Sequence, residues 1–216
     1  MGKRDGRVLP VAWRAAVVAL SFLSAPAAWA QSQDSKWAFG ARVGLTLPTE
    51  ELNGFTGTKP DSGFLVNLDL LYKASPTLDI GGSIEYQNNK MPSISGPGTA
   101  GGAFGESTIT VLTLMAVGQY RFNRSAKTSP YAVAGIGLNI NWMGDDQAGS
   151  SFDVDPSLAL KVGVGVDFYV SKTTALNLEA GYKVNSSTVT RFPPTGSAQS
   201  HDFNMSMLYL LGGVRF

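Results

Sequence analysis

The sequence contains no cysteine, which excludes a disulfide framework, a thiolate metal site, a cysteine nucleophile and a lipid anchor on an N-terminal cysteine. Charged residues are scarce, at 15% of 216 residues, whereas glycine is abundant, with 25 copies. Both values are unusual for a soluble enzyme. The composition therefore points away from a soluble catalyst.

Long apolar runs are missing from most of the chain. After residue 30, no stretch reaches the roughly 18 consecutive apolar residues of a membrane-spanning helix, and no helical period is present. Residues 1–30 hold four of the 17 lysines and arginines but only one of the 16 acidic residues, so residues 31–216 carry a net charge of −2. This balance predicts no nucleic-acid partner.

Residues 1–30 have the three parts of a secretory signal peptide. A basic segment comes first, the apolar stretch AAVVALSFL follows at 15–23, and Ala28-Trp29-Ala30 supplies a small-residue cleavage site. The apolar stretch is too short to cross a bilayer as a helix. We therefore expect cleavage after Ala30 and a mature domain of residues 31–216; the alternative is an uncleaved anchor.

What the mature chain does contain is alternation of apolar and polar residues. The segment 158–170 is the clearest case, with one apolar stripe formed by Leu158, Leu160, Val162, Val164, Val166, Phe168 and Val170. Segments 36–47, 78–87 and 175–185 repeat the pattern, and 63–72, 107–122, 131–142 and 203–216 fit it less cleanly. A period of two predicts strands, here eight of them.

The connections between these strands alternate in length. Those at 48–62, 88–106, 143–157 and 186–202 are long, and those at 73–77, 123–130 and 171–174 are short. This alternation is typical of outer-membrane barrels, which have long extracellular loops and short periplasmic turns. We predict an all-β fold, an eight-stranded antiparallel transmembrane β-barrel with up-and-down meander topology, and both mature termini in the periplasm.

The last segment, LYLLGGVRF at 208–216, ends on an aromatic ring. A closed barrel must satisfy every backbone group because lipid offers no hydrogen bonds, so we expect this strand to pair with the first one and Phe216 to face lipid. The alternative is a secreted β-sandwich or lipocalin-like barrel, which has a dense apolar core. Here the second face holds glycine, serine, asparagine and ten charged residues, a composition that favours the lumen of a membrane barrel.

The inward-facing charged residues are predicted to form a polar plug, because unpaired charges in a narrow lumen would be costly. They are Arg42, Asp69, Asp79, Glu85, Arg121, Lys161, Asp167, Glu179, Lys183 and Arg215, five of each sign. Five of them map to the periplasmic half, and Asp79 and Arg121 lie within reach of each other on neighbouring strands. An eight-stranded barrel holds little more than its own side chains, so a wide water pore is not expected.

The upper lumen is predicted to be apolar. Its candidate lining residues are Leu65, Val111, Met115, Met205 and Met207, and the two other mature methionines, Met91 and Met143, map to the same end. Methionine is adaptable and often lines promiscuous apolar sites. Two interpretations stay open: a cavity that passes hydrophobic solutes sideways into lipid, or methionines that only fill an irregular barrel top.

Two polar groupings in the long connections are weaker candidates. Asp145, Asp146, Asp153 and Asp155 are close in sequence but lack the order of a calcium-binding loop, so we expect a solvated acidic loop, bridged at most by divalent ions to lipopolysaccharide. His201 lies near Ser197, Ser200 and Asp202 on one loop without the rigid spacing of a catalytic triad. We expect no enzyme activity, no cofactor and no resident metal.

Several segments resemble the OmpW-like and OmpA-like family of eight-stranded outer-membrane barrels. SPYAVAGIGLNI (129–140) is similar to the family's PYxGxGxG strand, and residues 160–184 resemble the hairpin that follows it. LMAVGQYRF (114–122) and the terminal GGVRF fit neighbouring strands, whereas ITVLTLM (109–115) stands where the family carries a proline-bearing segment.

The resemblance implies a function and partners. It implies a narrow conduit for small hydrophobic compounds into the outer membrane, surrounded by outer-membrane lipid and lipopolysaccharide, with Phe216 recognised by the barrel assembly machinery. The alternative is a non-conducting structural or adhesin-type barrel whose extracellular loops bind a surface partner.

Overall fold

The structure of the chain is a computed structural model that describes residues 36–50, 59–91, 107–124, 127–144, 151–192 and 197–216. The expected signal peptide, residues 1–30, lies outside these ranges. Ten β-strands occupy the described residues, and none of these residues forms a helix long and apolar enough to cross a membrane. The strands are β1 (Trp37–Pro48), β2 (Gly63–Lys73), β3 (Leu78–Met91), β4 (Ser107–Arg121), β5 (Thr128–Met143), β6 (Ser151–Val154), β7 (Ser157–Tyr169), β8 (Ala175–Phe192), β9 (Gln199–Asn204) and β10 (Met207–Arg215).

The strands form a closed antiparallel barrel in meander order. Each consecutive barrel strand pairs with the next, and β10 returns to pair with β1, from Gly40 opposite Arg215 to Pro48 opposite Met207. Pairing continues to the end of the chain, because Phe39 and Phe216 exchange backbone hydrogen bonds of 3.0 and 2.8 Å. Closure leaves the barrel wall without a free edge, as a lipid-facing sheet requires. The all-β meander barrel expected from the sequence is confirmed.

The ten strands make eight barrel strands because two of these are interrupted. The segments β9 and β10 keep one register against β8, with Ser186 opposite Asn204 and Lys183 opposite Met207. The segments β6 and β7 also both pair with β8, and they belong to a single barrel strand with a break at residues 155–156. The sequence predicted long loops at 143–157 and 186–202. This prediction is wrong in part, because β6, the end of β8 and the start of β9 occupy parts of these ranges.

The break between β6 and β7 is a β-bulge. The backbone N–H of Asp155 donates to Thr188 at 3.0 Å, while the next regular pair joins Ala159 to Asn185. The chain advances four residues from Asp155 to Ala159, whereas the opposite strand spans only three residues from Thr188 to Asn185. The segment β6–β7 therefore contains one extra residue. Proline has no N–H to donate to a neighbouring strand, so Pro156 suits such a bulge.

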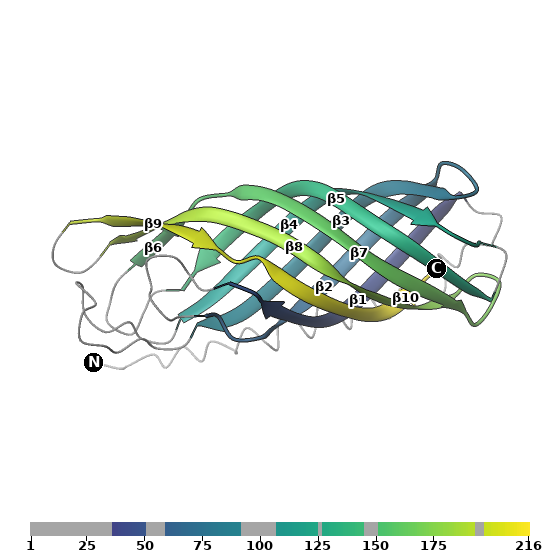
Figure 1. Cartoon of the computed structure of the whole chain (residues 1–216), viewed down its shortest axis with the longest axis horizontal. Coiled ribbons are helices and arrows are strands. Elements are labelled where there is room, and N and C mark those ends of the chain that lie inside the picture. Colours follow the sequence, from purple (N-terminus) through teal and green to yellow (C-terminus); the bar gives the residue numbers. More distant parts are fainter. Residues whose placement is uncertain (1–35, 51–58, 92–106, 125–126, 145–150, 193–196) are drawn as a thin grey trace, which may run out of the picture.

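The two faces of the wall differ as the alternation predicts. Large apolar side chains such as Leu45, Ile84 and Val164 are exposed on the outside, while alternate positions are buried in the lumen. The short turns and the C-terminus lie at one end, here called the turn end, and the other end is called the loop end. At the loop end β6 and β9 project beyond the rest of the barrel (Figure 1).

Candidate functional site: the barrel lumen

All ten charged residues predicted for the lumen are buried there, each at most 4% exposed, and each belongs to an ion pair. They form two connected layers. The layer nearest the turn end, called the lower layer, contains Asp79, Arg121, Asp167 and Arg215. The layer above it, called the middle layer, contains Arg42, Asp69, Glu85, Lys161, Glu179 and Lys183.

In the lower layer, Arg121 joins two carboxylates. Its Nε donates to Asp79 at 2.6 Å and its Nη1 donates to Asp167 at 2.7 Å, so the expected pair between Asp79 and Arg121 is present. Arg215 adds a second contact to Asp167 at 2.6 Å. Arg124, from the turn after β4, adds a second contact to Asp79 at 2.6 Å. Each carboxylate of this layer is therefore held by two arginines.

In the middle layer, Glu179 contacts two cations and two tyrosine hydroxyls. It accepts from Arg42, lies 2.9 Å from the ammonium of Lys161, and accepts the hydroxyls of Tyr131 at 2.9 Å and Tyr209 at 3.2 Å. Buried ionic groups are tolerated only when such contacts replace their hydration.

Glu85 forms the upper edge of the middle layer. Its two oxygens lie 2.8 Å from the ammonium of Lys161 and 3.2 Å from that of Lys183. At the lower edge, Asp69 pairs with Arg42 and lies 3.7 Å from Arg215. The charges thus extend beyond the basal plug that the sequence suggested, in a continuous network from Asp79 to Lys183.

Two tyrosines complete this network, and the sequence reasoning did not single them out. Tyr131 and Tyr209 are buried in the lumen, and their rings lie over glycines of β7 and β8. A Cβ at Gly165 would clash with the Tyr131 ring, and one at Gly163 with the Tyr209 hydroxyl. Because glycine has no side chain, these positions leave the space that the tyrosine rings fill. An inward aromatic residue opposite an inward glycine is the sequence signal that could have identified the two tyrosines.

Above the middle layer lies a layer of neutral polar side chains that the sequence reasoning also missed. The hydroxyl of Ser157 donates to Asn185 at 2.6 Å and accepts from Asn139 at 3.2 Å. Asn185 donates to Asn141 at 2.8 Å, and Gln87 donates to Asn89 at 2.7 Å. These residues occupy inward positions of their strands, so the alternation alone could have placed them in the lumen.

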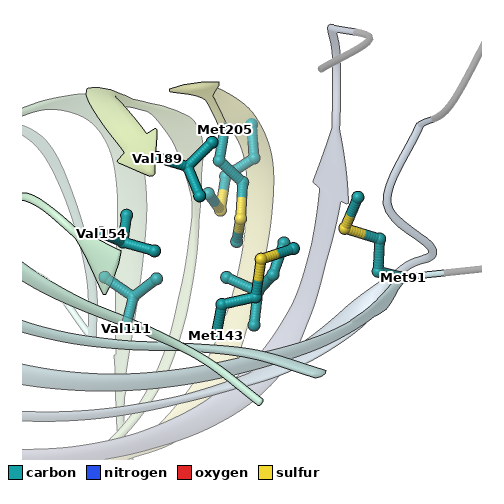
Figure 2. Packing of buried hydrophobic residues seen from close by; sticks show 8 residues of the cluster. Met91, Val111, Met143, Val154, Val189 and Met205 are labelled. Atoms are coloured by element: carbon teal, nitrogen blue, oxygen red, sulfur yellow. The ribbon is translucent and has the colours of Figure 1, made fainter. Parts of the chain in front are cut away.

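At the loop end the lumen is closed by apolar side chains, which we call the mouth cluster. Its members are Met91, Ile109, Val111, Met143, Val154, Val189, Met205 and Met207, and Phe152 packs against them. Figure 2 shows these side chains reaching inward from strands on different sides of the barrel. Four thioethers in one cluster of eight make its surface unusually adaptable.

The mouth cluster contains three of the five residues predicted for the apolar upper lumen: Val111, Met205 and Met207. Leu65 belongs to a separate cluster with Tyr209 and Leu211. Met115 belongs to another cluster, with Leu71, Ala38, Val117 and Ala159, so the structure does not bring it together with the mouth methionines. Met115 lies in the middle of β4, the ninth of its 15 residues, whereas Met91 and Met143 are the last residues of β3 and β5 at the loop end.

The bulge beside the mouth cluster forms a polar notch of 580 Å³. It extends over three adjacent strand segments and is lined by residues 155–158 of the bulge, by Ser186, Ser187 and Thr188 of β8, and by Asp202 and Asn204 of β9. Val154 and Val189 of the mouth cluster are the chain neighbours of Asp155 and Thr188. The notch therefore lies beside the mouth cluster in sequence, at a bulge where regular strand pairing pauses between Asp155 and Ala159.

The acidic candidates do not form one site. Asp153 is exposed on β6 and Asp155 is exposed in the bulge, whereas Asp145 and Asp146 lie outside the described residues. Across the described ranges, histidine and acidic side chains form no group of three suited to a metal ion. His201 belongs to β9.

A closed eight-stranded barrel with an apolar outer wall and a polar lumen is the architecture of outer-membrane barrels. Residues 15–209 match the family model of the outer membrane protein beta-barrel domain, so the chain belongs to that family. The family expected from the sequence is thereby confirmed at the level of the outer-membrane barrel. A comparison with curated proteins gives no match.

Solved structures share this fold. The outer membrane protein OprG from Pseudomonas aeruginosa aligns with a TM-score of 0.65 and 16% identity over 86% of this chain and 98% of its own. The outer membrane protein AlkL aligns with a TM-score of 0.54 and 17% identity over 83% and 88%. Outer Membrane Protein W of E. coli aligns with a TM-score of 0.47 and 19% identity over 84% and 96%.

Proposed function

We propose that this outer-membrane barrel is a narrow conduit that takes small hydrophobic compounds from the loop end into the bilayer. The observation that carries the proposal is the mouth cluster, the largest apolar cluster among the described lumen residues, which lies at the loop end above the polar and charged layers. Because methionine side chains are flexible, the cluster can rearrange around apolar solutes of different shape. An apolar solute that enters there exchanges water for apolar surface.

A straight path through the barrel is unfavourable for such a solute. Below the mouth cluster it would meet the neutral polar layer and then the two charged layers, whose groups form hydrogen bonds and ion pairs with one another. Separating these groups around an apolar molecule would leave buried charges unpaired. The exit that avoids this cost is sideways, through the notch at the Pro156 bulge, where the ladder between β7 and β8 is interrupted.

Uptake by liposomes carrying the purified barrel tests the entry site. An alkane-like solute should enter faster than through empty liposomes, and a sugar should not. Met207→Gln should abolish the difference, because a buried polar amide disfavours an apolar ligand, while Met207→Leu should retain it. Glutamine is preferable to lysine here because position 207 pairs with Lys183. Equal uptake by the glutamine and leucine variants would overturn the conduit.

The exit is tested by obstruction. Since the chain has no cysteine, Ser186→Cys introduces a unique thiol at the notch, and a bulky maleimide there should slow uptake. The matched control is Lys172→Cys, an exposed position in the short turn between β7 and β8. Inhibition by neither label, or by both equally, would exclude the notch as the route.

We also propose that the turn end faces the periplasm, that residues 1–30 are removed on export, and that Phe216 takes part in assembly. Support comes from the backbone pairing of Phe216 with Phe39, which completes the closing seam of the barrel. Deleting Phe216 should leave a periplasmic, protease-sensitive protein. Heat-modifiable barrel in the membrane fraction of this deletion would contradict the assembly role.

The alternative is a non-conducting barrel that binds a surface partner. The observation that favours it is the extension formed by β6, β8 and β9, which projects beyond the barrel at the loop end (Figure 1). This alternative predicts liposome uptake no faster than that of empty liposomes for every solute.

A further inference from the structure

One buried amide oxygen beside the mouth cluster has no hydrogen-bond partner among the described residues. It is Oε1 of Gln87, a fully buried residue of β3. The residues directly opposite Gln87 are Leu65 of β2 and Val111 of β4, and Val111 belongs to the mouth cluster. Directly opposite residues of an antiparallel pair have Cβ atoms about 5 Å apart. This acceptor therefore lies on a side chain flanked by apolar residues at the edge of the mouth cluster.

A chain of hydrogen bonds fixes the orientation of the Gln87 amide. The backbone carbonyl of Asp61 can only accept, so the atom of Asn89 that lies 2.9 Å from it is the donor Nδ2. Asn89 Oδ1 is then the acceptor for Gln87 Nε2, at 2.7 Å. Exchanging the two ends of the Gln87 amide would place one carbonyl oxygen against another. The free atom of this amide is therefore an acceptor, which a ligand can meet only with a donor.

The other unpartnered polar atoms lie elsewhere in the lumen. Within the part of the chain that the structure describes, they belong to Asp69, Ser83, Gln119, Asn177 and Arg215. None of the residues directly opposite these five is a member of the mouth cluster. A buried acceptor without a partner has lost its hydration, so a ligand that donates to it restores a hydrogen bond. Gln87 is thus the acceptor of this kind that adjoins the apolar site.

The surrounding charges restrict what kind of donor fits. Glu85 lies two residues from Gln87 on the same face of β3, and its carboxylate lies 3.2 Å from the ammonium of Lys183, which is directly opposite Met207 of the mouth cluster. The middle layer to which both charges belong holds equal numbers of each sign. A charged ligand group would lose its hydration there without gaining an unpaired counter-ion. A neutral hydroxyl avoids this cost and still donates a hydrogen bond.

We infer that the mouth cluster selects hydrophobic compounds that carry a neutral hydroxyl, which donates to Gln87 Oε1 while the apolar part packs among the methionines. The inference rests on the proposed function, because it concerns the same entry site, and it names the class of compound that this site prefers. Compounds of equal hydrophobicity that cannot donate a hydrogen bond leave the acceptor of Gln87 unsatisfied, so they bind less tightly.

Two isomers separate hydrogen-bond donation from hydrophobicity, because octanol can donate and heptyl methyl ether can only accept. Each is titrated into the barrel in lipid nanodiscs, and the methyl groups of carbon-13-labelled methionines are followed by NMR. Met91, Met143, Met205 and Met207 report on the mouth cluster, and Met115, which belongs to another cluster, is the internal control. The wild type should bind octanol more tightly by about fivefold to tenfold. Equal affinities would overturn the inference, whatever the behaviour of any variant.

Substitution of the acceptor is the second test. Gln87→Met keeps an unbranched side chain and removes the acceptor, so it should abolish the preference for octanol. The matched control is Gln119→Met, because Gln119 is also buried with an unpartnered Oε1 but lies opposite Asp79 and Val133. Loss of the preference in both variants, or in neither, would contradict the role of Gln87. Tighter binding of octanoate or octylammonium than of octanol would contradict the choice of a neutral donor.

The same titration separates this inference from the conduit. If both isomers shift the mouth methionines with equal affinity, the hydroxyl preference is overturned and the entry site stands. If neither isomer shifts these methionines, the entry site and the preference are both overturned. Tighter binding of octanol in the wild type, lost in Gln87→Met and kept in Gln119→Met, supports both.

Discussion

The two ends of the lumen solve the same packing problem with opposite chemistry. Toward the turn end, charged side chains and two tyrosines fill much of the space, and Arg121 with Asp79 and Arg215 with Asp167 form ion pairs of 2.6 Å. Toward the loop end, the mouth cluster fills it with apolar side chains, half of them methionine. Charged groups tolerate little displacement because each depends on a specific partner, whereas apolar side chains can exchange neighbours. The difference assigns rigidity to one end of the lumen and adaptability to the other.

Removing the carboxylate that holds two cations and two tyrosines should show the largest effect. Glu179→Ala removes one of the two carboxylates that pair with Arg42 and one of the two that pair with Lys161. It also removes the acceptor of the Tyr131 and Tyr209 hydroxyls. Breaking a buried pair costs about 3–5 kcal/mol, and we expect a loss in this range in the free energy of unfolding in urea. The control is Asp153→Ala, an exposed carboxylate on β6. A midpoint equal to that of the control would mean that the network adds no stability.

A charge with redundant partners should matter less. Arg121→Ala removes a contact from Asp79 and from Asp167, but Arg124 and Arg215 still hold these carboxylates. The loss should therefore be nearer the ~1.5–3 kcal/mol of a single hydrogen bond to a charged group. Lys127→Ala, exposed in the turn before β5, should leave the urea midpoint unchanged. A loss larger than that of Glu179→Ala would show that the lower layer contributes more to stability than the middle layer.

A comparable or smaller loss of stability is expected when a methyl group is added to an inward glycine whose free space is filled by a tyrosine ring. Gly165→Ala directs a methyl group into the Tyr131 ring and against the backbone carbonyl oxygen of Leu178, and such overpacking costs roughly 1–3 kcal/mol. Gly82→Ala is the matched control, because the nearest atom to a Cβ there is the carbonyl oxygen of Met115 at 3.8 Å. The urea midpoints of the two variants measure the difference, and equal midpoints would show that Tyr131 moves at no cost.

The sequence predicted the faces of the wall better than the heights within it. Alternation assigns Asp79 and Arg121 to the lumen whatever the exact register, and the ion pair between them is present. Height within the lumen is harder to read from the sequence, because it depends on tilt and shear and on exact strand bounds: Met115 lies in the middle of β4 and belongs to a different cluster from the loop-end methionines. The bulge was missed for a similar reason: Pro156 reads as a loop residue, and only the pairing of β6 with β8 shows that the strand continues past it.

The smallest effect on stability should come from the mouth cluster. Met205→Leu keeps an apolar side chain of similar volume at a fully buried position, and such exchanges usually cost less than about 1.5 kcal/mol. The same change removes one of four thioethers, so it should slow the uptake of bulky hydrophobic solutes more than that of slender ones, because leucine adapts its shape less readily than methionine. Urea midpoints and liposome uptake, measured on the same preparation, separate these two quantities. A large loss of stability without any change in solute preference would show that the apolar end of the lumen is as rigid as the charged end.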